Sequence, residues 1–346
     1  MEARGYAAHN AGAILAPFSF SRRDLRDHDV ALDVLFCGVC HSDIHQVNED
    51  WGPSIFPMVP GHEIVGVVTE LGPSVKRFKV GDRIGVGTFV DSCRNCEYCL
   101  SGEEQYCVTG DTPTYNGLER DGTTIAFGGY SNRFVVDEAY AVRVPDSLDP
   151  AGVAPLLCAG ITLYSPLRHW NASKETTVGI VGLGGLGHLG VKFAAALGAE
   201  TTVFSHSANK RADARRLGAH HFVDTSDEQE LTKLSGQYDL IINAVSADIN
   251  LAPYLELLKV NGTLVLVGLP RHPYALGAGS LVNKRRSVAG SMAGGMKELQ
   301  EMMDFCAEHE ITSDVEVVRA DYIQKAFERT VASDVKYRFV LDASSF

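Results

Sequence analysis

The sequence predicts an α/β protein made of a β-rich part and a doubly wound parallel sheet. With 346 residues, the chain is longer than one ordinary hydrophobic core accommodates, so we expect about two domains. Short alternating segments separated by turn residues fill the first 150 residues, which favours antiparallel strands. From Thr176 onward, apolar strands alternate with helical stretches, and this alternation is typical of a parallel sheet covered by helices.

In the first part, the clearest predicted strands are Glu63–Thr69 and Asp82–Gly87. The turn pairs Gly72-Pro73 and Gly81-Asp82 separate these segments from their neighbours. Glycine and proline at such positions end strands and reverse the chain. We therefore expect an antiparallel, barrel-like domain.

The second part is predicted as a regular series of strands and helices. In order, these are a strand at 176–184, a helix at 186–197, a strand at 201–205, a helix at 209–217, and strands at 221–224, 238–245 and 262–270. A long helix follows Gly290, with a buried face formed by Leu299, Met302, Met303 and Cys306 at i, i+3, i+4 and i+7. A last strand, Val335–Asp342, is expected to return to the first part.

Composition and charge exclude several classes of function. Acidic residues outnumber basic ones 43 to 31, giving a net charge of −12, which disfavours binding to nucleic acids or anionic membranes. There is no run of eighteen apolar residues, so we expect no membrane span. The first residues lack a basic flank before an apolar stretch, so we expect no export signal and a cytoplasmic protein with reduced thiols.

Half of the eight cysteines cluster within fifteen residues, with the spacing C-x2-C-x2-C-x7-C. Four thiolates so spaced can enclose one tetrahedral Zn²⁺ without leaving an open position, which makes a structural site. An iron–sulfur cluster is the alternative that cysteine spacing leaves open. The sequence therefore predicts a structural zinc lobe near residues 91–108, with the ligands Cys93, Cys96, Cys99 and Cys107.

A second set of metal-binding residue types is spread along the chain. The motif CGVCHSD at 37–43 contains two thiols, a histidine and a carboxylate, His62-Glu63 precedes an apolar strand, and Cys158 lies in LLCAGIT. Taken singly, such residues are more often structural than ligands. Together, two thiolates and an imidazole can form a catalytic zinc site, whose fourth position is open to water, substrate or an exchangeable carboxylate.

The segment GLGGLG at 182–187 matches the glycine pattern of dinucleotide-binding loops. It follows the buried strand Thr177–Val181 and begins a helix, which is the context that the pattern requires. Glycines there let the backbone turn tightly and approach a pyrophosphate at the helix N-terminus. The predicted contacts come from Gly182, Gly184, Gly185, Leu186 and Gly187.

The end of the next strand indicates which dinucleotide is bound. NAD is usually held by an acidic residue at this point, through the ribose 2′-hydroxyl. The segment SHSANKR at 205–211 contains no acid and offers hydroxyls and two cations. These groups suit a 2′-phosphate, so the sequence favours NADP(H) over NAD(H). The predicted contacts are Ser205, His206, Ser207, Lys210 and Arg211.

Together, these motifs resemble the zinc-dependent medium-chain alcohol dehydrogenases, and in detail the cinnamyl alcohol dehydrogenase branch with its bacterial NADPH-dependent aldehyde reductases. The resemblance runs from Cys37 to Asp342 and is carried by CGVCHSDIHQV, VPGHEIVGVV, VGDRIGVG, the four-cysteine loop, APLLCAGITLYSPLRHW, VGLGGLGHLGVK, GSMAGGMKE and DVKYRFVLD. It implies a GroES-like catalytic domain (1–153 and 294–346), a Rossmann NADP-binding domain (154–293) and a homodimer.

The resemblance also implies the ligands of the catalytic zinc. Cys40, His62 and Cys158 match the ligand positions of the family. Glu63 matches a carboxylate that can occupy the fourth position and exchange with water or substrate. Asp43 matches an acid that orients the zinc-bound imidazole.

Further positions match residues that act around the zinc and the cofactor. Ser42 and His45 match a proton relay that runs through a nicotinamide ribose hydroxyl to solvent. Arg338 matches an arginine near the cofactor pyrophosphate and Glu63, whereas Cys37 has no ligand role in the family. The stretch Thr112–Thr124 matches loosely and is expected to line the substrate entrance.

The expected activity is reversible hydride transfer between NADP(H) and primary alcohols or aldehydes of aromatic, allylic or medium-chain aliphatic type. Two zinc ions per chain are expected, the catalytic one polarising the substrate oxygen. One alternative is an NAD-dependent alcohol or polyol dehydrogenase of the same superfamily. Another is a non-catalytic cofactor-binding protein on the same scaffold, which we would expect to have lost the open zinc site.

Overall fold

The computed structural model describes residues 1–346, the side chain of Glu228 excepted, and it divides into two compact units. The first comprises Met1–Ile161 and Gly294–Phe346, and the second comprises Thr162–Ala293. The boundary predicted between residues 153 and 154 lies earlier in the chain. The short 3-10 helix η3 (Ala154–Leu157) belongs to the first unit because Leu157 packs against Gly85, where an added Cβ would lie 2.8 Å from the leucine side chain.

A seven-stranded sheet forms the centre of the first unit. Its strands are β3 (Asp29–Gly38), β4 (Ile64–Leu71), β5 (Arg83–Val86), β10 (Arg133–Asp137), β11 (Val142–Arg143), β18 (Val315–Arg319) and β19 (Arg338–Asp342). The main path runs β11-β5-β4-β3-β19-β18, and β10 also pairs with β3. The pairs are antiparallel except for β18 with β19. The predicted antiparallel character and the return of the last strand to the first part are therefore confirmed.

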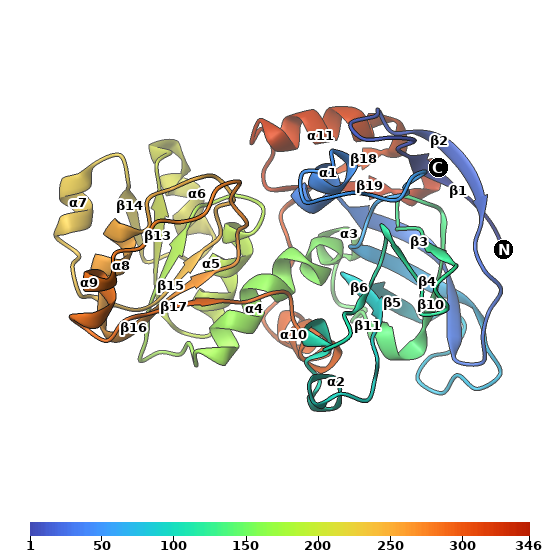
Figure 1. Cartoon of the computed structure of the whole chain (residues 1–346), viewed down its shortest axis with the longest axis horizontal. Helices are drawn as coiled ribbons and strands as arrows, with labels where there is room; N and C mark the ends of the chain where they lie inside the picture. The colour runs from blue at the N-terminus through green and yellow to red at the C-terminus, as the bar shows by residue number, and fades with distance from the viewer. The chain divides into compact units, whose positions relative to one another are not determined.

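Smaller elements surround this sheet (Figure 1). Three two-stranded sheets pair β1 (Glu2–Ala7) with β2 (Ala16–Ser21), β6 (Phe89–Asp91) with β7 (Thr112–Pro113), and β8 (Gly117–Leu118) with β9 (Ile125–Ala126). The α-helices are α1 (His41–Val47), α2 (Glu97–Ser101), α3 (Pro150–Val153), α10 (Met296–Glu308) and α11 (Ile323–Val331). Helix α10 buries the four residues predicted for its inner face.

The second unit contains a six-stranded parallel sheet. Its strands are β12 (Thr177–Val181), β13 (Glu200–Ser205), β14 (His221–Asp224), β15 (Tyr238–Asn243), β16 (Leu258–Leu266) and β17 (Ser287–Gly290). Their order, β14-β13-β12-β15-β16-β17, is the 3-2-1-4-5-6 arrangement of a doubly wound dinucleotide-binding fold. The predicted fold class is thereby confirmed.

Helices connect these strands. They are α4 (Ala159–His169), which leads into the unit, α5 (Gly187–Ala196), α6 (Arg211–Arg216), α7 (Glu228–Thr232), α8 (Ala252–Leu257) and α9 (Ala278–Val282). Helix α5 packs against β12 and β13, and α6 packs against β14. The helix predicted at 209–217 is shorter than expected because a 3-10 turn, Ala208–Lys210, precedes α6 and Gly218 ends it with φ +109°.

Each unit has its own hydrophobic core. In the first, Leu32, Ile64 and Phe339 are fully buried from β3, β4 and β19. In the second, Phe204 and Ile241 lie at the centre of a cluster between the sheet and its helices. No single helix among the described residues is long and apolar enough to cross a membrane, although Pro150–Leu157 and Ala159–His169, bent by 59°, pass that test together by length and composition.

Candidate active site

Four predicted ligands meet in the first unit from three separate places in the chain. Cys40 precedes helix α1, His62 and Glu63 precede strand β4, and Cys158 follows η3. One ligand atom from each lies within 4.8 Å of the others, and the four residues form a single candidate metal site. Cys37, the other thiol of the CGVCHSD motif, lies outside this group and is buried in the core.

The donor set fits a zinc ion. Cys40 Sγ and Cys158 Sγ lie 4.0 Å apart. Two sulfurs bound at about 2.3 Å to one tetrahedral zinc would lie about 3.8 Å apart, so the observed separation needs little adjustment. Thiolate and imidazole are the ligands that zinc prefers, and the fourth donor, Glu63, is the exchangeable carboxylate that the sequence predicts.

Asp43 orients the imidazole of His62. Its Oδ1 lies 3.2 Å from His62 Nδ1 and accepts the backbone N–H of Gly61 at 3.1 Å, while Oδ2 accepts the backbone N–H of Cys40 at 2.9 Å. A carboxylate at Nδ1 leaves Nε2 available as the ligand atom. Burial lowers the pKa of His62, but the neighbouring Asp43 and Cys40 raise it more, so its pKa lies well above the usual value.

Arg338 holds Glu63 from the last strand of the sheet. Its Nη2 donates to both carboxylate oxygens of Glu63, at 2.6 and 2.8 Å, and Nε and Nη2 also donate to the carbonyl of Val39. Gly38 gives Glu63 the room it needs, since an added Cβ would lie 1.9 Å from Oε2. Burial raises the pKa of Glu63 to about 7, against the opposing effect of Arg338.

The Nη1 atom of Arg338 is buried without a hydrogen-bond partner among the described residues. A buried donor of this kind usually binds an acceptor that the protein itself does not supply. This fits the predicted position of Arg338 near a cofactor pyrophosphate, which stays a prediction.

The two sulfurs of the site lie within hydrogen-bond distance of each other. The hydrogen bond from the Cys158 thiol, helped by the nearby His62 and Arg338, holds the pKa of Cys40 well below its usual range. Conversely, its hydrogen bond to Cys40 and its burial raise the pKa of Cys158. Cys40 is therefore the more acidic of the two thiols, and zinc binding would require both as thiolates.

Ser42 and His45, the predicted proton relay, both lie on α1. Ser42 Oγ is 3.5 Å from Cys40 Sγ. His45 Nδ1 is 2.8 Å from the carboxylate of Asp50, and the indole of Trp51 lies 4.8 Å from its ring. Asp50 is not among the predicted site residues, although its place five residues after His45, just beyond the helix, is a signal for this contact.

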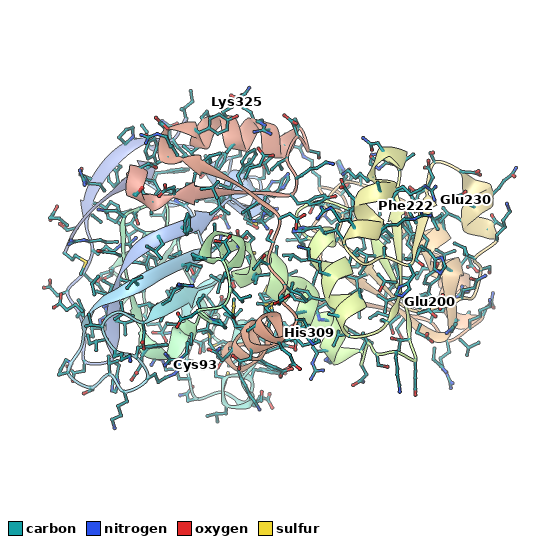
Figure 2. The ribbon with its side chains drawn as sticks, turned by 180° about the vertical axis from the view of Figure 1, so that it is seen from behind. Cys93, Glu200, Phe222, Glu230, His309 and Lys325 are labelled. Atoms are coloured by element: carbon teal, nitrogen blue, oxygen red, sulfur yellow. The ribbon has the colours of Figure 1, made fainter. Side chains whose placement is uncertain are left out.

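The four-cysteine lobe forms the second candidate metal site. Its sulfurs lie within 4.8 Å of one another, with Cys99 Sγ 3.8 Å from Cys93 Sγ and 3.4 Å from Cys96 Sγ. Backbone N–H groups point at two of the sulfurs, Cys93 N at Cys107 Sγ and Cys96 N at Cys93 Sγ. Four sulfurs at these separations fit a closed tetrahedral zinc site. Figure 2 shows Cys93 at the start of this lobe.

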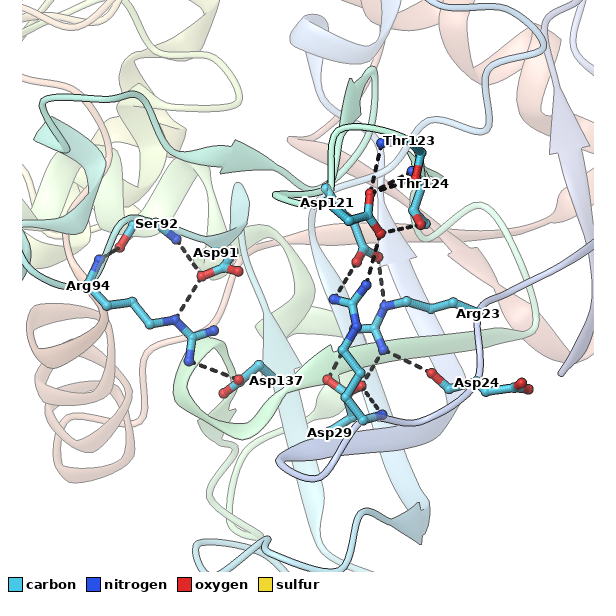
Figure 3. A network of polar contacts seen from close by, with 12 residues as sticks. Arg23, Asp24, Asp29, Asp91, Ser92, Arg94, Asp121, Thr123, Thr124 and Asp137 are labelled. Atoms are coloured by element: carbon cyan, nitrogen blue, oxygen red, sulfur yellow. Dashed lines mark hydrogen bonds and ion pairs between the residues drawn. The ribbon is translucent and has the colours of Figure 1, made fainter.

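Contacts with Tyr140 and Asp137, which lie outside the lobe, fix its first residues. Ser92 Oγ lies 3.1 Å from Cys99 Sγ and 2.6 Å from the hydroxyl of Tyr140. Arg94 pairs with Asp91 and Asp137 and lies over the ring of Tyr140, as part of the polar network in Figure 3. These contacts hold the loop that carries Cys93 against the end of β10.

The glycine loop of the second unit has the geometry that a pyrophosphate site needs. Gly182 has φ +90°, and an added Cβ would lie 2.6 Å from Val245. At Gly187 an added Cβ would lie 1.9 Å from the Gly182 carbonyl, so this glycine permits the close approach of helix α5 to the loop. Around Gly184 there is open space, where a ligand can approach the backbone.

The predicted 2′-phosphate segment follows this loop at the end of β13. Ser205 ends the strand and is buried, and its Oγ accepts the backbone N–H of Ser207. Lys210 Nζ donates to the Leu183 carbonyl in the glycine loop, so it reaches the same place. Arg211 instead donates to the Phe222 carbonyl and lies over the ring of Phe222, which Figure 2 labels. His206 is exposed.

Family models match both units. The alcohol dehydrogenase GroES-like domain matches residues 26–146, and the zinc-binding dehydrogenase domain matches residues 185–308. An NADP-dependent alcohol dehydrogenase C of Mycolicibacterium smegmatis is 54% identical over 98% of this chain and 97% of its own. The chain therefore belongs to the zinc-dependent alcohol dehydrogenases with a GroES-like domain.

Similarity to solved structures indicates the branch of the family to which the chain belongs. A cinnamyl alcohol dehydrogenase from Sorghum bicolor superposes with a TM-score of 0.96 at 46% identity, covering 99% of this chain and 98% of that one. The Helicobacter pylori enzyme of the same type, complexed with NADP(H), gives 0.94 at 40% identity, covering 100% and 99%. Within the family, the chain is of the cinnamyl alcohol dehydrogenase type, as the sequence predicts.

Proposed function

We propose that the protein is a zinc-dependent NADP(H) alcohol dehydrogenase that interconverts primary alcohols and aldehydes. The observation that carries this proposal is the buried convergence of Cys40, His62, Glu63 and Cys158. Cys40, His62 and Cys158 would bind zinc permanently, whereas Glu63 can be replaced by water or substrate. The site is therefore of the open, catalytic kind.

The residues around the site would hold the substrate oxygen and supply its proton. When bound, zinc would polarise the carbonyl oxygen of an aldehyde, and the nicotinamide would deliver the hydride to its carbon. We assign the accompanying proton transfer to the hydroxyl of Ser42. The carboxylate of Asp50 favours a proton on Nδ1 of His45, so Nε2 is the atom that exchanges a proton between the relay and solvent.

The choice of NADP(H) is supported by the end of strand β13. Ser205 stands where NAD-binding chains of this fold usually have an acid, and Ser207 and Lys210 lie close by. Two of the relatives described above carry NADP in their names or complexes. The contacts of His206 and Arg211 with the 2′-phosphate stay predictions.

For the substrate, we propose aromatic, allylic or medium-chain aliphatic aldehydes. The aromatic side chains of Trp51 and Phe56 lie in the segment between α1 and His62, and both are partly exposed. Met58, in the same segment, is 1% exposed and belongs to the core.

The test is to follow the absorbance of NADPH, and separately NADH, with cinnamaldehyde or benzaldehyde and zinc-replete protein. We expect rapid oxidation of NADPH and slow oxidation of NADH. Comparable rates of NADPH and NADH oxidation would support the zinc-dependent reaction but refute the preference for a cofactor with a 2′-phosphate. No oxidation of either, together with fewer than two zinc ions per chain, would favour the non-catalytic alternative.

The assembly and the location of the protein are further proposals. We propose a homodimer formed through the edge strands of the second unit, where β17 ends the parallel sheet and Val282 nearby is 73% exposed. Light scattering after size exclusion would test it, and a monomer would refute it. Reduced thiol ligands suit the cytoplasm, which fractionation of cells would test.

A further inference from the structure

The buried carboxylate of Asp43 is held by backbone and side-chain donors. Two donors are the backbone N–H groups of Cys40 and Gly61, and a third is Nδ1 of His62. Two tyrosines add to these donors: the hydroxyl of Tyr130 lies 2.8 Å from Asp43 Oδ2, and the side chain of Tyr115 also interacts with Asp43. Both Asp43 and Tyr130 have no exposed surface, so water does not compete for this contact.

The position of the Tyr130 hydroxyl is fixed by the same segment that carries His62. Tyr130 N donates to the Pro60 carbonyl at 2.9 Å, and Gly129 N donates to the Gly61 carbonyl at 2.8 Å. The ring packs on Gly61, where an added Cβ would lie 2.6 Å from Tyr130 Cδ1. The tyrosine and the histidine are therefore held to each other by backbone as well as through Asp43.

We propose that Tyr130 is a positioning residue of the catalytic zinc site, whose hydroxyl fixes Asp43 and, through Asp43, the orientation of the His62 imidazole. This inference rests on the proposed function, because it assumes that His62 binds zinc. A carboxylate held by donors on both oxygens cannot rotate, so it presents Oδ1 to His62 Nδ1 at a constant angle. Partners one step beyond the ligands tune metal affinity in this way.

The hydroxyl of Tyr130 stays protonated at neutral pH and therefore remains a hydrogen-bond donor. Burial, together with the charge of Asp43, raises the pKa of Tyr130 well above its usual value. Removal of this donor would leave Oδ2 with the Cys40 amide, and the carboxylate with its interaction with Tyr115. The carboxylate would then be free to turn toward that amide and to weaken its contact with His62.

A second buried tyrosine in the same unit provides a matched control. Tyr140 is 2% exposed, and its hydroxyl contacts Ser92, which in turn contacts Cys99 of the four-cysteine lobe. Tyr130→Phe and Tyr140→Phe thus delete the same atom from equally buried rings. Of these two hydroxyls, only that of Tyr130 contacts Asp43, which in turn contacts the predicted catalytic ligand His62.

The test is the rate at which zinc is released to an excess of a chromogenic chelator. Wild-type protein should show two phases, and Cys40→Ala, which removes a catalytic ligand, assigns them. We expect Tyr130→Phe to accelerate the catalytic phase by about 10-fold, the lower end of the effects of such partners. The structural phase should not change, and Tyr140→Phe should leave the catalytic phase as it is.

An unchanged catalytic phase in Tyr130→Phe, within twofold of the wild type, would overturn the proposal. So would equal acceleration by Tyr140→Phe, because it would show a general effect of loosening the core. If wild-type protein has no catalytic phase at all, the proposed function fails instead, and the two failures are thereby distinguished.

The route through Asp43 is tested with Asp43→Asn alone and combined with Tyr130→Phe. If the hydroxyl acts through Asp43, the double variant should release catalytic zinc no faster than Asp43→Asn. If the increases in release rate of the two single variants multiply in the double variant, the assigned route through Asp43 is wrong. The comparison of Tyr130→Phe with Tyr140→Phe decides the role of Tyr130 even if Asp43→Asn does not fold.

Discussion

Arg338 and Glu63 form a buried ion pair that joins β19, the last strand of the chain, to the segment that carries His62, a predicted zinc ligand. The guanidinium is 4% exposed and the carboxylate has no exposed surface. The same guanidinium binds the Val39 carbonyl, one residue before Cys40. The closing strand of the chain thus holds two of the segments that build the metal site.

Replacement of Arg338 by Leu should destabilise the first unit by about 3–5 kcal/mol, because it leaves the Glu63 carboxylate buried without its partner. The free energy of unfolding, measured with urea, checks this. The double variant Arg338→Leu with Glu63→Gln removes both charges and should recover part of the loss. A loss below about 1 kcal/mol in the single variant would contradict the prediction.

Cys99→Ser should remove about one equivalent of zinc per chain and lower the thermal stability of the first unit, because a closed structural site contributes folding energy. Zinc content by atomic emission and the melting temperature check both effects. The control is Cys306→Ala, which removes a buried thiol of α10 that belongs to neither ligand set. Retention of two zinc ions by Cys99→Ser would show that the lobe does not bind zinc.

Glu138 gives a prediction on acid stability. Burial raises the pKa of its carboxyl, but the backbone N–H groups of Arg77 and Lys76 and the ring of His28 lower it more, so its pKa in the folded protein lies below the ordinary value. Such a carboxylate contributes stability above its unfolded pKa of about 4.3 and loses it as the pH falls through the folded value.

Glu138→Gln should therefore be less stable than the wild type by about 1–2 kcal/mol at pH 7. This difference should shrink as the pH falls below about 4.3, because the wild type then loses what the variant already lacks. Urea unfolding at several pH values measures it, with the exposed Glu70→Gln as a control. A difference that grows on acidification would contradict the sign of the argument.

The sequence predicts the elements whose signal is local. β12 coincides with the strand predicted from its apolar run, and the parallel order follows from the alternation of strands and helices. β16 begins at Leu258, earlier than predicted, because Asn261-Gly262 has the residue types of a turn, whereas the strand continues through this pair with Asn261 at φ +68°. β17 is not among the predicted strands because it is only four residues long and partly exposed.

Residue types and the resemblance predict the ligand set, and the resemblance also predicts Asp43 beside the imidazole and Arg338 near Glu63, but nothing in the sequence predicts the contact of Tyr130 with Asp43. The contact of Tyr130 with Asp43 joins residues 87 positions apart, and that of Arg338 with Glu63 spans 275. Such side-chain pairs leave no periodic trace in the sequence. They depend on how β3, β4 and β19 align, which only the tertiary structure specifies.

The last prediction concerns the choice of cofactor at the end of β13. Ser205→Asp places a carboxylate where an NAD-binding chain would hold the ribose 2′-hydroxyl, and the same charge repels a 2′-phosphate. We expect the KM for NADPH to rise by about 10- to 100-fold, the equivalent of about 1.4–2.8 kcal/mol, while the efficiency with NADH improves. Steady-state kinetics with both cofactors measure this, and Ser207→Ala, which removes a hydroxyl without adding charge, should weaken NADPH binding without improving NADH. An unchanged ratio of the two cofactors in Ser205→Asp would place the 2′-phosphate elsewhere in the second unit.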